Sequence, residues 1–249
     1  MSRAAPASDA AVASAGRWLS SYLKQSELPL YSLAFLLPAM ALFEIGVSFR
    51  SADPIAFRML QIFFNQLGAT GRFVPVLSVA GILLTWHIAR KDPWHIRMET
   101  LWGMTLESLM LAVPLLGLGV AVARWNIHVP LSANTSQWSS SAVLSLGAGV
   151  YEEFVFRLGL MTLISIVAAD VLRLPKTLSN LLMVLISAIL FSLYHYLGAE
   201  KFQLQSFVFR TGAGIYFAVL FLTRGFGVTS GCHIAYDITI VTLQAFALH

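Results

Sequence analysis

The chain has 249 residues, of which 57% are hydrophobic and 11% are charged, and its mean hydropathy is +0.75. Soluble globular domains have about 45–50% apolar and about 25% charged residues, so the composition excludes an ordinary water-soluble protein. The net charge of +4 is small and its basic residues are scattered, which argues against a surface that binds nucleic acid. A single cysteine, Cys232, excludes an intrachain disulfide.

Residues 1–27 are predicted to be an N-terminal tail and a helix at the membrane surface. Residues 1–16 are rich in alanine and serine and lack the apolar segment of a signal peptide. Between residues 17 and 25, aromatic and leucine side chains recur near one helical face, beside polar partners. This pattern is typical of a helix that lies at the interface. The side chains on this face are Trp18, Leu19, Tyr22 and Leu23.

Residues 28–249 are predicted to form the transmembrane domain. They contain seven apolar segments of the length needed to cross a hydrocarbon layer of about 30 Å as helices. The fourth segment is long for one straight crossing, so an eighth span is an alternative. We therefore expect an all-α, polytopic transmembrane bundle of seven to eight spans. The segments are residues 28–49, 73–89, 104–123, 142–169, 178–197, 205–222 and 232–248.

The lysines and arginines of the connections predict the orientation, because such residues are retained on the cytoplasmic side. If the seven segments alternate, nine basic residues lie on the N-terminal side of the membrane and five lie on the other side. We therefore expect a cytoplasmic N-terminus. The membrane itself is expected to be a bacterial inner membrane.

Ionisable side chains inside the predicted spans form three clusters. Each such group costs at least about 2.5–3.5 kcal/mol at the membrane centre, so it is expected to face a partner or a hydrated cavity. Each cluster has a structural interpretation when it is taken alone. Three acids, two histidines and an arginine within three spans of a chain poor in charge nevertheless favour one shared site. The clusters are Glu152-Glu153-x-x-x-Arg157, Phe191-x-x-x-His195 and His233-x-x-x-Asp237.

Helical spacing gives the two adjacent acids different surroundings. Glu153 and Arg157 are four residues apart, so they can form an ion pair on one face. Glu152 is rotated by about 100° from Glu153 and cannot share that partner equally. It is therefore available as a general base that takes a proton from water.

The same spacing relates the residues of the other two clusters. Phe191 and His195 share a helical face, so the phenylalanine ring could wall a pocket that the imidazole enters. His233 and Asp237 also share a face, which allows the carboxylate to fix the tautomer of the imidazole. Cys232 is interpreted as a small buried residue and not as a reactive thiol.

Three further charged residues inside the predicted spans, Glu44, Glu107 and Arg210, have no motif context. For each of them we expect a structural role, in which the side chain pairs with another group or faces the interior of the bundle.

In this order and in hydrophobic segments, the three clusters resemble the motifs of the CPBP family. This family contains the CAAX-prenyl-protease and bacteriocin-processing intramembrane peptidases and is also called the Abi family. The resemblance covers about residues 142–245. It implies an endopeptidase in which Glu152 and His195 activate a water and His233 helps to stabilise the oxyanion. Glu153 and Arg157 would brace the site.

Asp237 departs from the pattern of this family, in which many members have asparagine at the equivalent position. An ionised aspartate cannot donate a hydrogen bond to an oxyanion. Unless burial keeps Asp237 protonated, we therefore expect it to orient His233.

The resemblance leaves cofactor and substrate open. Glu152, His195 and His233 could ligate zinc, but the sequence lacks His-Glu-x-x-His and His233 already has a carboxylate partner. A metal-free glutamate mechanism is therefore preferred. The implied partners are the lipid bilayer and a membrane-associated or lipidated peptide or protein substrate, with no nucleic acid.

Two other classes of function are compatible with the sequence. A proton-coupled transporter also uses buried Glu, Arg and His, and Gly212 and Gly214 would permit a broken helix; against this class, no two-fold repeat is detectable. A non-catalytic membrane scaffold of the same family is the other class, because family resemblance does not guarantee activity.

Straight, alternating spans would keep the two histidines apart. At 1.5 Å per residue, His195 would lie near the outer face and His233 about 10 Å from the inner face. Tilted or broken helices, a later start of the fifth segment, or a re-entrant segment 205–222 would each bring them together.

Overall fold

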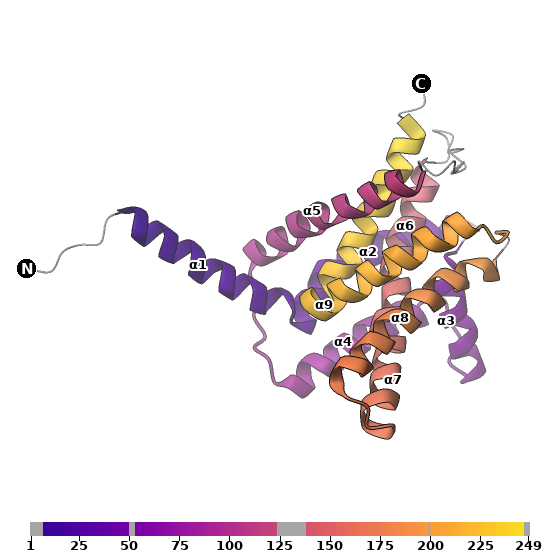
Figure 1. The fold of residues 1–249 in the computed structure, drawn as a ribbon, viewed down its shortest axis with the longest axis horizontal. Helices are drawn as coiled ribbons and strands as arrows, with labels where there is room; N and C mark the ends of the chain where they lie inside the picture. The colour runs from indigo at the N-terminus through magenta and orange to yellow at the C-terminus, as the bar shows by residue number, and fades with distance from the viewer. Residues whose placement is uncertain (1–6, 50–52, 124–137, 199, 247–249) are drawn as a thin grey trace, which may run out of the picture.

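The computed structural model describes residues 7–49, 53–123, 138–198 and 200–246. Within these ranges the regular structure is entirely helical, which confirms the predicted all-α membrane bundle. Figure 1 shows a bundle of helices from which α1 projects. The helices are α1 (Ala7–Ser26), α2 (Pro29–Ser48), α3 (Ile55–Gln66), α4 (Val74–Arg90), α5 (Met98–Ala123), α6 (Trp138–Glu153), α7 (Thr162–Ser165), α8 (Lys176–Tyr194) and α9 (Leu204–Phe246).

In the described part of the chain, five helical stretches are long and apolar enough to cross a membrane, and α4 is a shorter apolar helix. The predicted sixth and seventh segments both fall within α9, up to its end at Phe246. Many large apolar side chains on the outer helices are exposed, as expected for surfaces that contact lipid. The chain is therefore an integral membrane protein. The five stretches are Pro29–Ser48, Met98–Val122, Trp138–Val171, Lys176–Leu197 and Leu204–Phe246.

The fourth predicted segment is one continuous helical stretch, without the additional span that its length allowed. After α6 ends at Glu153, the chain continues as a π-helix over Phe154–Met161, passes through α7 and ends in a second π-helical segment, Ile166–Val171. Wide π-helical turns occur frequently at functional sites. Here the change of geometry begins directly after the two acids of the first cluster.

Helix α9 changes direction at Gly225, where φ is 77° and ψ is −179°. Glycine adopts this backbone conformation readily because it has no Cβ, whereas other residues rarely do. The second half of α9 therefore begins at Phe226 and not at Cys232, where the sequence analysis placed the start of the last span. In Figure 1 the two halves form an angle, and the first half, residues 204–224, lies beside α8.

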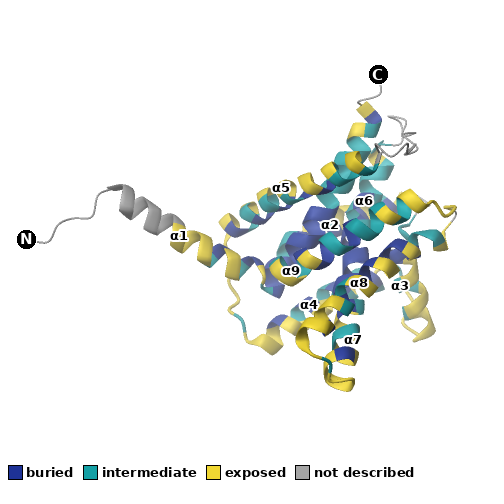
Figure 2. Ribbon diagram, viewed as in Figure 1, coloured by how far each residue is buried: buried dark blue, intermediate teal, exposed yellow. Residues whose placement is uncertain are grey.

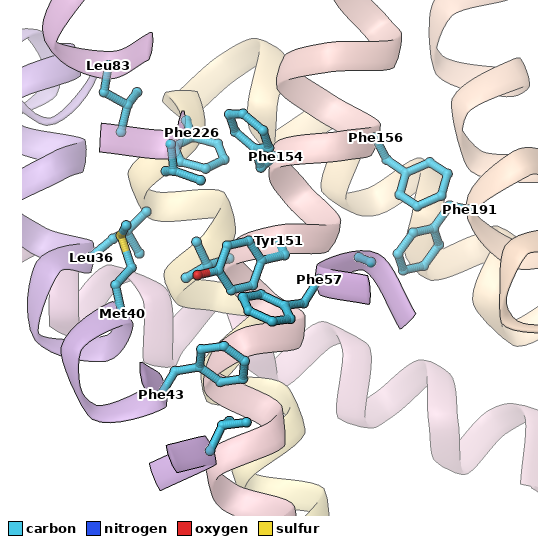
Figure 3. Packing of buried hydrophobic residues seen from close by; sticks show 14 of the residues in the cluster. Leu36, Met40, Phe43, Phe57, Leu83, Tyr151, Phe154, Phe156, Phe191 and Phe226 are labelled. Carbon is cyan, nitrogen blue, oxygen red and sulfur yellow. The ribbon is translucent and has the colours of Figure 1, made fainter. Parts of the chain in front are cut away.

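Aromatic packing fixes the rotation of α6. Figure 2 shows the buried residues concentrated where α2, α6 and α9 meet. The rings of Phe43, Phe57 and Tyr151 pack edge to face, with centroids 5.0 to 5.4 Å apart, and join α2 and α3 to α6 (Figure 3). Each such pair contributes about 0.5–1.5 kcal/mol beyond the area it buries. Because successive helical residues point about 100° apart, Glu152 is directed away from this cluster.

The three charged residues without motif context all have polar partners, as predicted. Glu44 accepts a hydrogen bond from the hydroxyl of Tyr151 at 3.2 Å. Glu107 forms an ion pair with Arg224. Arg210 donates hydrogen bonds to both carboxylate oxygens of Glu200, which lies in the connection between α8 and α9, at 2.9 and 2.8 Å.

Candidate active site

The three motif clusters meet at one carboxylate, that of Glu152. Glu152 lies at the end of α6, His195 follows the last residue of α8, and His233 lies in the second half of α9. Oε2 of Glu152 is 3.9 Å from Nε2 of His195 and 3.8 Å from Nε2 of His233. The structure therefore brings together three residues that straight spans would separate.

Two features of the backbone account for this meeting. The break at Gly225 starts the second half of α9 early, so His233 lies about 10 Å along the helix from Phe226. Gly149, one turn before Glu153, lets α6 approach α9 closely, because a Cβ at this position would lie 2.8 Å from the backbone nitrogen of Ile234. Figure 1 also shows α8, which ends at the site, lying obliquely to α6. A broken helix and tilted helices, two of the alternatives open from the sequence, are therefore both present.

Glu153 orients His233. Nδ1 of His233 lies 2.8 Å from Oε1 of Glu153, and a carboxylate paired with an arginine can only accept, so Nδ1 donates. Nε2 then faces Oε2 of Glu152 and Oδ2 of Asp237, the latter at 3.6 Å. Spacing within one helix indicated Asp237 as the orienting carboxylate. The close approach of α6 gives the Nδ1 contact to Glu153 and leaves Asp237 beside Nε2.

The imidazole of His195 presents a lone pair to Glu152. Its Nδ1 lies 2.8 Å from the carbonyl oxygen of Phe191, which can only accept, so Nδ1 carries the proton in the neutral ring. Nε2 and Oε2 of Glu152 are then two acceptors that face each other across 3.9 Å, too far for a direct hydrogen bond. A single water that lies to one side of this line can donate a hydrogen bond of ordinary length to each of the two atoms.

Tyr194 completes the surroundings of Glu152, and the sequence analysis did not select it as a site residue. Its hydroxyl donates a hydrogen bond to Oε1 of Glu152, which leaves Oε2 to face the two histidines. Tyr194 is the last residue of α8, and a tight turn over His195–Leu197 follows it. The available signal was its position next to the motif histidine at a predicted helix end.

Glu153 and Arg157 form the predicted ion pair, with Nε 3.1 Å from Oε2 and both side chains 0% exposed. The guanidinium also donates to the carbonyl oxygen of Gly214 at 3.2 Å and lies over the ring of Phe191, 4.5 Å from its centroid. The pair therefore joins α8 and α9 to the helical stretch that begins with α6. Breaking such a buried pair by removing one partner is strongly destabilising.

Two phenylalanine rings pack against the histidines. The ring of Phe191 lies 5.1 Å from that of His195 and 6.1 Å from that of His233, so it contacts the histidine that shares its helical face and the one on α9. The rings of Phe191 and Phe156 also pack edge to face, with centroids 5.4 Å apart (Figure 3). Phe217 stacks on His233 at 4.5 Å with an interplanar angle of 20°. The sequence analysis missed Phe217, because it lies in an apolar segment where phenylalanine is ordinary.

The site is most exposed near His195 and Asp237. Their side chains are 19% and 26% exposed, compared with 8% for Glu152 and 6% for His233. On the other side of His233, Cys232 is fully buried, as expected.

Arg210 and Glu200 lie on the exposed side of the site. Arg210 interacts electrostatically with His195 and Asp237 and forms an ion pair with Glu200. Burial raises the pKa of Glu200, but the hydrogen bonds and positive charge of Arg210 outweigh this effect and lower the pKa below its ordinary value. Glu200 is therefore ionised near neutral pH, and the ion pair ties the connection between α8 and α9 to α9.

Among the residues that the structure describes, no group of three or more His, Cys, Asp and Glu side chains could hold a metal ion. The zinc alternative would use Oε2 of Glu152 and the Nε2 atoms of His195 and His233 as ligands, each about 2 Å from the metal. Treatment with a zinc chelator distinguishes this alternative from a metal-free site, because only a zinc site would lose its activity.

Comparison with known families supports the resemblance found in the sequence. Residues 134–239 match the family model described as type II CAAX prenyl endopeptidase Rce1-like. The matched region includes all three motif clusters, and the predicted family assignment is confirmed. Neither a curated protein nor a solved structure matches the chain.

Proposed function

Because the chain belongs, through residues 134–239, to the Rce1-like family of type II CAAX prenyl endopeptidases, we propose that it is an intramembrane endopeptidase. Its substrate is a peptide or protein that is associated with the membrane or carries a lipid. The observation that supports this function most directly is the convergence of His195 and His233 on Oε2 of Glu152, between helices of membrane-spanning length. Hydrolysis within a bilayer requires a water held beside a base, and we assign Glu152 as that base.

Glu152 and His195 hold and activate the water. A water between their facing acceptors can donate one hydrogen bond to each, at about 2.8 Å, and its oxygen lone pair then points towards the peptide carbonyl. When the oxygen attacks the carbonyl carbon, Glu152 takes the proton. The proton passes to the amide nitrogen as the C–N bond breaks. Such general acid–base catalysis contributes about 10²–10⁴-fold to a rate.

His233 stabilises the oxyanion. Because its Nδ1 donates to Glu153, Nε2 can donate to the negatively charged oxygen only from the imidazolium form. A donor aligned in advance for this role lowers the barrier by about 3–4 kcal/mol. Asp237, beside Nε2, is a carboxylate partner for this ring when no substrate is bound.

The remaining motif residues brace these groups. The buried Glu153–Arg157 pair holds His233 through Nδ1, while the ring of Phe191 contacts both the guanidinium of Arg157 and the imidazole of His195. The chemistry needs no metal ion.

We place the N-terminus on the cytoplasmic side of a bacterial inner membrane. The end of α1, the start of α5 and the break in α9 are joined at one end of the bundle, because Gln25 bonds to Thr100 and Glu27 pairs with Arg224. Lys24 of α1, Arg97 before α5 and Arg224 at the break in α9 therefore lie towards one end of the bundle, as retention of positive charge in the cytoplasm requires.

The direct test compares membranes that contain the wild-type protein, Glu152→Gln or the control Glu99→Gln, whose carboxylate is exposed at the start of α5. Peptide termini are identified by mass spectrometry. We expect termini that are present with the wild type and the control and absent with Glu152→Gln. If the termini are the same in all three membranes, the protein is not a peptidase, and a scaffold or a transporter becomes the better assignment.

A further inference from the structure

A second cluster of charged groups, which the proposed chemistry does not use, surrounds the break in α9. Arg224 directly precedes Gly225. Its guanidinium donates to both carboxylate oxygens of Glu107 on α5, at 2.5 and 2.9 Å. It also donates to Glu27 at 3.2 Å and to the hydroxyl of Ser26 at 2.8 Å. One arginine therefore joins α9, α5 and the end of α1 at the residue where α9 changes direction.

The pairing between Arg224 and Glu107 is strong for its position. Two parallel hydrogen bonds between a guanidinium and a carboxylate fix the relative orientation of the two groups as well as their distance. Both side chains are mostly buried, so salt and water screen the pair less than a surface ion pair. The hydroxyl of Tyr22 on α1 donates to the same carboxylate. Glu107 is thereby held on two sides.

The first residues after the break are seated against α2 and α5. The backbone nitrogen of Gly227 donates to the hydroxyl of Ser32 on α2 at 3.1 Å. The hydroxyl of Ser108 on α5 donates to the carbonyl oxygen of Val228 at 3.4 Å. Ser108 directly follows Glu107, so neighbouring residues of α5 hold the chain on both sides of Gly225.

We propose that Arg224 and Glu107 are positioning residues for the active site: their ion pair sets the angle of the break in α9 and thereby the place of His233 relative to Glu152. This inference rests on the proposed peptidase function. His233 lies eight residues beyond Gly225, about 12 Å along the helix. At this distance a change of about 5° in the angle moves the imidazole by about 1 Å, and a misplacement of that size can reduce a catalysed rate about 10²-fold.

The proposal also gives a role to helices outside the region that matches the family. Glu107 and Tyr22 belong to α5 and α1, which precede residues 134–239. Through Arg224, these helices act on a residue of the matched region without contacting the substrate.

The single cysteine makes the proposal testable without relying on activity. Cys232 is fully buried and directly precedes His233 on α9, where it packs with Ala112 of α5 and Phe217. The rate at which N-ethylmaleimide modifies Cys232 in membranes therefore reports the packing of this part of α9. The kcat and KM of peptide cleavage are measured in parallel. The kcat is calculated per molecule of folded, monodisperse protein.

The variants are Arg224→Gln, Glu107→Gln and the conservative Arg224→Lys. The control is Arg97→Gln, which breaks an exposed ion pair with Glu99 that does not involve α9. We expect both glutamine substitutions at the break to accelerate modification of Cys232 and to lower kcat about 10²-fold with little change in KM. Arg224→Lys, which keeps the charge but loses the two-fold bonding, should restore part of both properties. The control should behave as the wild type.

Wild-type protection of Cys232 and wild-type kcat in both Arg224→Gln and Glu107→Gln would overturn the proposal. If these two variants fail to accumulate, the same two measurements are made on Arg224→Lys. Faster modification of Cys232 and a lower kcat than in the wild type support the proposal, whereas wild-type values of both overturn it. If the wild type cleaves no peptide but the maleimide rates follow the expected order, the peptidase assignment fails, while the control of the α9 break by Arg224 is supported. The two failures are therefore distinguishable.

Discussion

Replacing Glu153 with glutamine should strongly destabilise the protein. The substitution removes the negative charge from an ion pair whose side chains are both 0% exposed and leaves Arg157 buried without a counter-ion. Breaking a buried pair in this way costs about 3–5 kcal/mol. Because folded proteins are stable by only about 5–15 kcal/mol, this loss is a large fraction of the total. The glutamine oxygen can still accept from Nδ1 of His233, so we attribute the loss to the ion pair.

The same substitution at the preceding residue should lower the activity and leave the stability nearly unchanged. Glu152→Gln keeps an acceptor for the hydroxyl of Tyr194 and leaves the Glu153–Arg157 pair intact. We therefore expect nearly wild-type stability, whereas peptide cleavage should fall about 10²–10⁴-fold because a general base is lost.

Thermal unfolding of the purified proteins in detergent, together with cleavage measured by mass spectrometry, distinguishes the two variants. Glu153→Gln should unfold at a clearly lower temperature than the wild type, and Glu152→Gln at nearly the same temperature. A Glu153→Gln variant as stable as the wild type would refute the assignment of Glu153 as the essential counter-ion of Arg157. Full cleavage activity in Glu152→Gln would remove the proposed base.

Three further outcomes are expected. Tyr194→Phe removes a hydrogen bond to a carboxylate, worth about 1.5–3 kcal/mol, and should lower kcat roughly 10–100-fold. The control Tyr196→Phe should leave kcat unchanged, and equal kcat values in the two variants would contradict the role of Tyr194. Gly225→Ala forces a side chain into a backbone conformation that is nearly restricted to glycine, at a cost of about 1–3 kcal/mol, and should lower the unfolding temperature. Gly117→Ala, within α5 and with open space around it, should not. Treatment with a zinc chelator should leave cleavage intact, and a loss that added zinc reverses would instead support a metal site.

The membrane-spanning helices could be predicted because their main determinant is local. Whether a segment partitions into lipid depends on its own length and composition, so the apolar segments were evident without knowledge of their neighbours. The break in α9 was placed less accurately. Residues 226–231 contain three residue types with modest or low helix propensity, Gly, Val and Thr, and were predicted to be a connection. They are helical because Ser32 and Ser108 hold their backbone from neighbouring helices.

The candidate site was predictable to the extent that its contacts lie within one helix. The four-residue spacing correctly paired Glu153 with Arg157. It could not reveal the bond between Glu153 and His233, which are 80 residues apart in the sequence. That bond depends on the close approach of α6 and α9 at Gly149, a property of two helices together.

The position of the Glu153–Arg157 pair within a single helical stretch has a consequence for how the protein is made. Both charges enter the bilayer at the same time during synthesis, so each is neutralised by its neighbour before the ribosome has produced α9. An acid whose counter-ion lay on a later helix would have to wait in lipid at a cost of at least about 2.5–3.5 kcal/mol. Moving the arginine by two residues would keep the composition of the helix but turn its cation away from the acid, and this stretch would then insert poorly.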